Sequence, residues 1–275
     1  MSYVRVFPLA LVLAGVPLPG RHDPYLVVVS RGASLSVRVE LAAAEGSPSL
    51  RFSRPLGWRV ELPLKSFLDT VSGRLEEPIE AVVEVEWEGV EQPPSATLYA
   101  AVSLALLEAV AAEGGYTLER GELLEAARSI DEDAGAWYDF VEGLRTAMLE
   151  EASLVYRYGE EPLRLGGGSS FTLRLAGEET VGEDVTGLLG GQLLPAVGRL
   201  AGLVVVELVG DLREHGWRLE PERWRLYSRL ENGLYYMLYG AQPPPEGCKW
   251  TPGLQGVYGV CSVESGVGDP VEFTL

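Results

Sequence analysis

Residues suited to proton transfer gather first in the loop 17–25, between two apolar stretches. Arg21, His22 and Asp23 follow one another there, so a cation, a titratable ring and a carboxylate stand together. Such a set could bind a polar substrate and exchange a proton with it. The loop is also rich in Pro, Gly and Asp, which build ordinary polar turns. Both interpretations are open at this point.

A second segment, residues 93–102, has features of an anion site. It leads into a predicted helix, and the first N–H groups of a helix are free and carry the positive end of its dipole. A phosphate binds well at such a place, and Ser95 or Thr97 could offer a hydroxyl to it or to Mg²⁺. Alternatively, one of these residues simply caps the helix. The segment has no glycine, so its backbone cannot easily wrap a polyphosphate.

Asp139 is the candidate for general acid–base chemistry. It follows the acidic run 131–133 and lies near the start of a predicted helix at 136–151. A carboxylate in that position could accept the proton of a substrate hydroxyl. The alternative is an aspartate that only stabilises the helix through its dipole.

A fourth segment, residues 256–275, contains Ser265, Gly266 and Gly268 between two apolar stretches. Two glycines this close allow a backbone to approach a ligand. They are equally typical of a tight hairpin between two strands.

The elements that must position these residues are strands in the N-terminal third. Apolar or alternating runs predict strands at 4–13, 25–30, 34–41, 58–62 and 79–87. In the last of these, Val83, Val85 and Trp87 alternate with glutamates, which is the pattern of a half-buried strand.

The pattern changes to the helical period at residues 98–112, and further helices are predicted at 118–130 and 136–151, with a strand at 154–158. The glycine-rich segment 166–170 predicts a hinge between domains 1–165 and 166–275. Beyond it we expect a strand at 171–175, helices at 181–200 and 221–239, a strand at 203–209, a Pro-rich turn at 243–245 and two closing strands. That order predicts a split α+β sandwich.

Composition limits the function classes. The chain has 275 residues, 47% of them hydrophobic, and a formal net charge of −18. This charge repels the phosphate backbone of nucleic acids, so we expect no nucleic-acid partner. The apolar stretch 6–18 follows one positive charge as in a signal peptide, but prolines interrupt it and it has no clean small-x-small cleavage site, which favours a buried first strand. Charges and glycines interrupt the stretch 188–210, which predicts a buried helix and a strand and no membrane span. We therefore expect a cytoplasmic protein.

The sparse residue types carry further information. Cys248 and Cys261 lack CxxC spacing, so they predict ordinary or mutually bridged structural cysteines. Two histidines are too few to suggest a His-based zinc site. Asn232 is the one asparagine, and few thermolabile amides favour a thermophilic source, although a GC-rich genome gives a similar bias.

The order of the four segments resembles the GHMP kinase superfamily, which includes galactokinase and the homoserine and mevalonate kinases. The segment 20–25 matches its Gly-Glu-His-x-Asp-type substrate loop, with His22 and Asp23 kept and Arg21 where an acid is common. The segment 94–102 occupies the place of its phosphate loop, Pro-x-x-x-Gly-Leu-Gly-Ser-Ser-Ala. Residues 135–139 and 265–268 correspond to its later Gly-x-x-Asp-type and Ser-Gly-x-Gly-type motifs.

The resemblance covers the whole chain and implies an α+β fold of two domains with the active site between them. The N-terminal domain would contain a left-handed crossover, and the C-terminal domain would be a ferredoxin-like split α+β sandwich. The implied activity is ATP-dependent phosphoryl transfer to a hydroxyl of a small molecule, with Mg²⁺ and possible homodimerisation.

The resemblance also assigns site residues. Asp139 would be catalytic, and Ser95 and Thr97 would hold Mg²⁺. Substrate would be bound by Arg21, His22 and Asp23. ATP would be bound by Ser95, Ala96, Thr97, Tyr99, Ser265, Gly266 and Gly268.

One departure from the family pattern keeps a second hypothesis open. The phosphate loop lacks every glycine of the family signature, and phosphoryl transfer depends on positioning and charge stabilisation. The alternative is therefore a catalytically inactive GHMP-fold protein that binds a metabolite or a partner. In that case we expect Tyr99, Trp137 or Tyr138 to fill the cleft. A kinase would leave the start of the helix open and Asp139 facing the same space.

Overall fold

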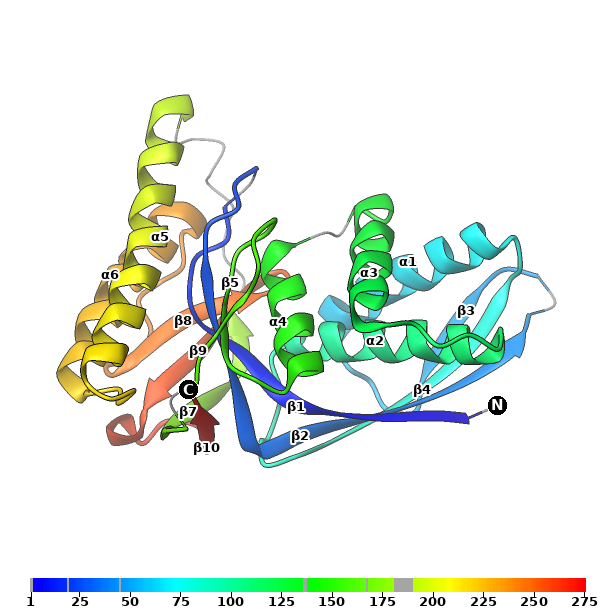
Figure 1. Cartoon of the computed structure of the whole chain (residues 1–275), viewed down its shortest axis with the longest axis horizontal. Coiled ribbons are helices and arrows are strands. Elements are labelled where there is room, and N and C mark those ends of the chain that lie inside the picture. Colours follow the sequence, from blue (N-terminus) through cyan, green and yellow to red (C-terminus); the bar gives the residue numbers. More distant parts are fainter. Residues whose placement is uncertain (1, 19, 45, 136–137, 167, 181–189) are drawn as a thin grey trace.

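In the computed structural model, the described residues are 2–18, 20–44, 46–135, 138–166, 168–180 and 190–275. Their strands form one sheet with helices packed against it (Figure 1). The main path of the sheet is β3-β4-β2-β10-β7-β9-β8, while β1 pairs with β2, and β5 pairs with both β2 and β6. The mixture of helices and strands confirms the predicted α+β class.

The N-terminal part is built on three long antiparallel strands: β1 (Ser2–Ala14), β2 (Tyr25–Ala43) and β4 (Ile79–Glu88). The two strands predicted at 25–30 and 34–41 are one strand, and Ser30 marks the place where its partner changes. β10 pairs with β2 at Ser30, and β4 pairs from Ser34 onward. The hydroxyl of Ser30 accepts the N–H groups of Gly32 and Ala33, which holds the strand together across this change.

The helices of this part pack against these strands or against one another. They are α1 (Trp58–Leu75), α2 (Ser95–Glu113), α3 (Arg120–Asp133) and α4 (Asp139–Glu150). α2 is long and apolar enough to cross a membrane, but 78% of its apolar stretch is buried inside the protein. This burial is typical of a core helix, and α2 packs against β1, β2, α1 and α4.

The strand predicted at 58–62 is wrong, because these residues form the first turns of α1. Val60, Leu64, Phe67, Leu68 and Val71 are buried at helical spacing, which five residues of apparent alternation could not reveal. α1 connects the short strand β3 (Ser49–Phe52) to β4, with which β3 pairs in parallel. The left-handed crossover stays a prediction.

The C-terminal part contains β7 (Ser170–Thr180), α5 (Gly190–Glu214), α6 (Pro221–Tyr239), β8 (Cys248–Gly253), β9 (Gly256–Ser262) and β10 (Asp269–Thr274). The strand predicted at 203–209 is wrong, since it lies within α5. Val204, Val205, Leu208 and Leu212 are buried there at helical spacing. Part of the helix predicted at 181–200 falls on residues 181–189, which lie outside the described residues.

The two parts share the sheet. β10 pairs with β2 on one side and with β7 on the other, and the short strands β5 (Leu154–Tyr156) and β6 (Leu163–Arg164) extend it at β2. The boundary predicted at residue 165 stays a prediction. Cys248 and Cys261 form a disulfide between β8 and β9, which decides between the two alternatives left open by the sequence.

Candidate functional site

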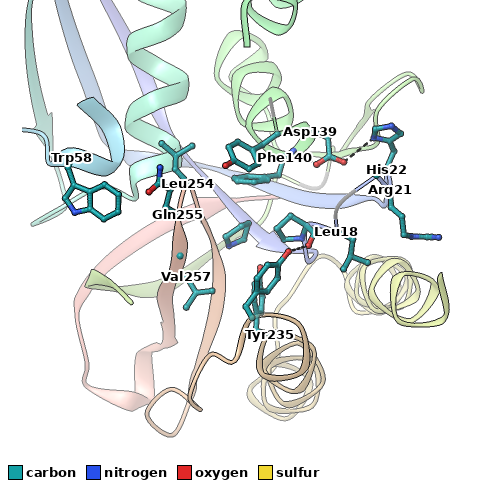
Figure 2. A pocket seen from close by; sticks show the side chains of 17 residues that line it. Leu18, Arg21, His22, Trp58, Asp139, Phe140, Tyr235, Leu254, Gln255 and Val257 are labelled. Carbon is teal, nitrogen blue, oxygen red and sulfur yellow. Dashed lines mark hydrogen bonds and ion pairs between the residues drawn. The ribbon is translucent and has the colours of Figure 1, made fainter. Parts of the chain in front are cut away.

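A pocket of about 600 Å³ lies where the loop after β1, the start of α4, one face of α6 and the β8–β9 turn meet (Figure 2). Its volume is in the usual range for small-molecule sites. Apolar and aromatic side chains dominate the lining: Leu18, Trp58, Tyr138, Phe140, Tyr235, Tyr239, Leu254 and Val257. Arg21, His22 and Asp139 bring the charged and titratable groups, so three of the predicted site residues meet here.

Asp139 is the first residue of α4, and its carboxyl group is fixed by two donors. Oδ1 accepts the hydroxyl of Tyr25 at 2.8 Å and the N–H of Phe140 at 2.9 Å. Oδ2 is buried and accepts no hydrogen bond among the described residues, while Nδ1 of His22 lies 3.6 Å from it. One oxygen is thus held by two hydrogen bonds, and the other is buried beside His22.

Burial raises the pKa of Asp139 from its ordinary value to about 6. The hydrogen bonds from Tyr25 and Phe140 and the proximity of His22 act in the opposite direction. Burial and the neighbouring carboxylate raise the pKa of Tyr25 well above its ordinary value, so Tyr25 stays protonated and donates. A carboxyl group with a pKa of about 6 is largely ionised at neutral pH and remains basic enough to take a proton.

The loop before β2 presents the remaining predicted substrate residues. Arg21 donates to both carboxylate oxygens of Asp23, at 2.9 and 2.8 Å. The guanidinium lies directly over Gly198 of α5, where an added Cβ would come within 2.1 Å of Nε. The ring of His22 packs against Tyr158, with 4.6 Å between ring centroids. Asp23 is buried under Arg21, so it positions that side chain and does not line the pocket.

A buried ion pair fixes the opposite wall. Lys249 of β8 donates to Glu231 of α6 and to the carbonyl of Leu13, and Glu231 accepts the N–H of Gly15 at 2.6 Å. Because α6 and β8 are tied to the end of β1 in this way, Tyr235 can face the pocket and donate to the carbonyl of Gly15 at 3.1 Å.

The β8–β9 turn, Gly253–Gly256, covers the start of α2. The N–H of Leu254 donates to Ser95 Oγ at 3.0 Å, and the hydroxyl of Tyr258 donates to the carbonyl of Gln92 at 3.0 Å. Ser95 lines a smaller cavity of about 80 Å³, which shares Trp58 with the main pocket. The start of α2 therefore lies beside the pocket but is not among its lining residues.

Solved structures match this chain along almost its whole length. The mevalonate kinase of Methanococcus jannaschii superposes with a TM-score of 0.61 at 10% identity, covering 96% of this chain and 92% of that one. The mevalonate diphosphate decarboxylase of Enterococcus faecalis superposes with a TM-score of 0.61 at 11% identity, covering 96% of this chain and 89% of that one. The Streptococcus pneumoniae phosphomevalonate kinase, solved in complex with phosphomevalonate and AMPPNP, superposes with a TM-score of 0.58 at 12% identity. The match covers 98% of this chain and 92% of that one.

The chain has the GHMP-kinase fold. Neither a protein-family model nor a curated protein sequence matches it, and identities of 10–12% establish the fold alone. The predicted fold class and the resemblance to GHMP kinases are confirmed at that level.

Within this GHMP fold, most side chains of the predicted phosphate loop are buried in the core. Ser95, Ala96, Thr97 and Tyr99 are all buried. Thr97 donates to the carbonyl of Ala10 at 2.7 Å, and Tyr99 donates to Asp131, which also pairs with Arg145. Tyr99 thus points into the core and does not fill the pocket. Tyr138 lines the pocket, and Trp137 lies outside the described residues.

The structure does not bring Ser265, Gly266 and Gly268 to the pocket. They follow β9 at the end remote from the β8–β9 turn, and Gly268 packs so closely on β7 that a Cβ would lie 2.0 Å from the carbonyl oxygen of Leu175. The hairpin alternative is also wrong, because β9 and β10 do not pair with each other: both pair with β7, which lies between them, so this segment crosses over β7. The turn that does reach the pocket was missed, although Gly253 and Gly256 between two apolar runs were its signal.

Proposed function

We propose that this GHMP-fold protein is an ATP-dependent small-molecule kinase that phosphorylates a hydroxyl group. The observation that supports the proposal is the Asp139 carboxyl group of the pocket, which has one oxygen fixed by Tyr25 and Phe140 and the other without a hydrogen-bond partner among the described residues. A general base needs this combination of geometry and a pKa near neutrality.

In the proposed reaction, the acceptor hydroxyl lies against Asp139 Oδ2. Its oxygen bonds to the γ-phosphorus of ATP while the bond from that phosphorus to the bridging oxygen breaks, and ADP leaves. The hydroxyl proton moves to Oδ2, and the donors on Oδ1 keep the carboxyl group in place. His22 and Arg21, at the same wall of the pocket, would orient the acceptor.

The predicted Mg²⁺ ligands do not fit a metal cage. Thr97 Oγ1 is buried and bonded to the backbone, and Ser95 Oγ accepts the N–H of Leu254. The described residues also contain no cluster of three or more His, Cys, Asp or Glu side chains suited to a metal. In this proposal Mg²⁺ enters only as the ion bound to the phosphates of ATP.

Thermal unfolding with and without MgATP tests nucleotide binding first. A ligand at 100 times its Kd stabilises the native state by about 2.7 kcal/mol. If the melting temperature rises with MgATP, ADP release is then measured with hydroxyl acceptors. Mevalonate and phosphomevalonate are the first acceptors to test, because similar structures include a mevalonate kinase and a phosphomevalonate kinase with phosphomevalonate bound. No shift at millimolar MgATP would contradict the proposal and support the non-catalytic alternative.

A further inference from the structure

A second cavity, of about 420 Å³, lies on the other side of α6, between that helix and the segment that leads into β8. α6 and β8 pack side by side in the C-terminal part (Figure 1). Tyr235 and Tyr239 of α6 face the Asp139 pocket, whereas Arg225, Ser228 and Arg229 face the second cavity. The two cavities have no lining residue in common.

The walls of this cavity are fixed without any ligand. The indole N–H of Trp224 donates to the carbonyl of Gly247 at 2.8 Å. Asn232 donates to the carbonyl of Cys248 at 3.0 Å and accepts the N–H of Trp250 at 2.9 Å. Pro243–Pro245 form the facing wall, and prolines bring restricted backbones without N–H donors. The cavity is therefore largely preformed.

The cations of this cavity are Arg225 and Arg229, which are exposed to solvent, and Ser228 is a buried polar group beside them. Arg225 and Arg229 are four residues apart on one helix face, where like charges repel. Neither has an ion pair with a carboxylate in the described part of the chain, although the chain carries 40 acidic residues against 22 basic ones. Ser228, between them, is 5% exposed, and its hydroxyl has no hydrogen-bond partner among the described residues.

We propose that this cavity binds a small organic oxyanion, a phosphate monoester or a carboxylate, at a site separate from the Asp139 pocket. The guanidinium groups of Arg225 and Arg229 and the hydroxyl of Ser228 hold the anionic group, since planar guanidinium donors match the oxygens of phosphates and carboxylates. The body of the ligand packs against Trp224, Tyr236 and the prolines. The exposed carboxylate of Glu246 at the rim repels the anion and limits affinity.

Calorimetric titration of the whole chain with phenyl phosphate, benzoate and inorganic phosphate at low salt tests the site. We expect phenyl phosphate or benzoate to bind more tightly than inorganic phosphate. The double variant Arg225→Gln/Arg229→Gln should weaken binding by at least about tenfold, because it removes charge-assisted hydrogen bonds. The matched control Arg213→Gln removes an exposed cation of α5 and should leave the affinity unchanged.

Two further variants separate a ligand site from a structural role. Ser228→Ala removes a hydroxyl that has no hydrogen-bond partner among the described residues, so it should weaken probe binding without lowering the melting temperature. Glu246→Gln should tighten binding. Equal affinities of the wild type and the arginine double variant would overturn the proposal, as would no binding of either aromatic probe at millimolar concentration. Preference for phenyl phosphate or for benzoate identifies the anionic group.

Discussion

At the scale of single residues, the proposed reaction depends on the charge of Asp139. Its pKa, raised by burial to about 6, lies close to neutrality. Only the ionised form accepts a proton. We therefore expect kcat/KM for phosphoryl transfer to rise with pH through about 6 and to level off above it. A pH profile of initial rates measures this, and a flat profile across that pH would contradict the role of Asp139 as base.

The variant Tyr25→Phe tests whether the pKa of Asp139 sets the pH profile. The Tyr25 hydroxyl bonds to Oδ1 and lowers the pKa of Asp139. Without it, the acid limb should move to higher pH while the protein stays folded. Tyr116→Phe is the matched control, because Tyr116 is 73% exposed and should leave the profile unchanged.

Replacing Asp139 with Asn should separate activity from stability. We expect the rate to fall by roughly 10²–10⁴-fold, the usual contribution of general base catalysis. The folded-state pKa is raised, so the carboxyl group stabilises the fold most when protonated, below its unfolded pKa. That contribution is lost as the pH rises through about 6.

At pH 8 the neutral amide should therefore unfold with a free energy higher by on the order of 1–3 kcal/mol. Urea denaturation of both proteins at pH 8 and at pH 4 tests this, since the difference should disappear at the lower pH. A variant that is inactive and also less stable at pH 8 would show that the loss of activity comes from misfolding.

At the scale of elements, a glycine of α5 supports the loop that carries Arg21. Gly198→Ala would place a methyl group where the Arg21 guanidinium now lies. We expect Arg21 to be displaced from Asp23 and KM for the acceptor to rise several-fold. Gly210→Ala in the same helix meets nothing within 4 Å, so it should leave KM unchanged and stabilise the helix by up to about 1 kcal/mol. Equal kinetics in both variants would contradict the contact.

The β8–β9 hairpin is joined by the disulfide between Cys248 and Cys261, which are separated by 13 positions. Cross-links over loops of this size stabilise proteins by about 3 kcal/mol. Reduction of the wild type should lower its melting temperature by several degrees, as followed by circular dichroism. The double variant Cys248→Ser/Cys261→Ser should melt lower from the outset and should no longer respond to reductant.

The sequence predicted most elements, because regular periodicity is a local property. The helix at 221–239 was predicted with its observed bounds. Asp139 and His22, both predicted as site residues, lie with Oδ2 and Nδ1 3.6 Å apart, and their roles stay predictions. The errors at 58–62 and 203–209 arose where short β-branched or alternating runs belong to longer buried helices. The contact of Leu254 with Ser95 joins residues far apart in the chain, so local pattern could not reveal it.

At the scale of the whole molecule, the continuous sheet predicts cooperative unfolding. β10 pairs with β7 along its length and with β2 at Val29 and Ser30, so the sheet runs through both parts without a break. We expect one calorimetric transition whose van't Hoff and calorimetric enthalpies agree. Two separated transitions would instead support independent domains divided at residue 165.

The disulfide between Cys248 and Cys261 bears on the cellular location of the protein. Disulfides persist mainly outside the cytosol, with intracellular proteins of hyperthermophiles as a known exception. A cytoplasmic location together with a thermophilic source, as predicted from the sequence, is compatible with the bond. Both stay predictions, as does the homodimer.

The position of β10 also has a consequence for how the protein is made. β10 completes the middle of the sheet, yet it is synthesised long after β2, beside which it pairs. Ribosomes add about 5–20 residues per second, so β2 waits on the order of 10–50 s for this neighbour. During that interval part of β2 presents an open edge to any passing strand. The newborn chain is then most exposed to aggregation, and chaperones would matter more for its yield than for its final stability.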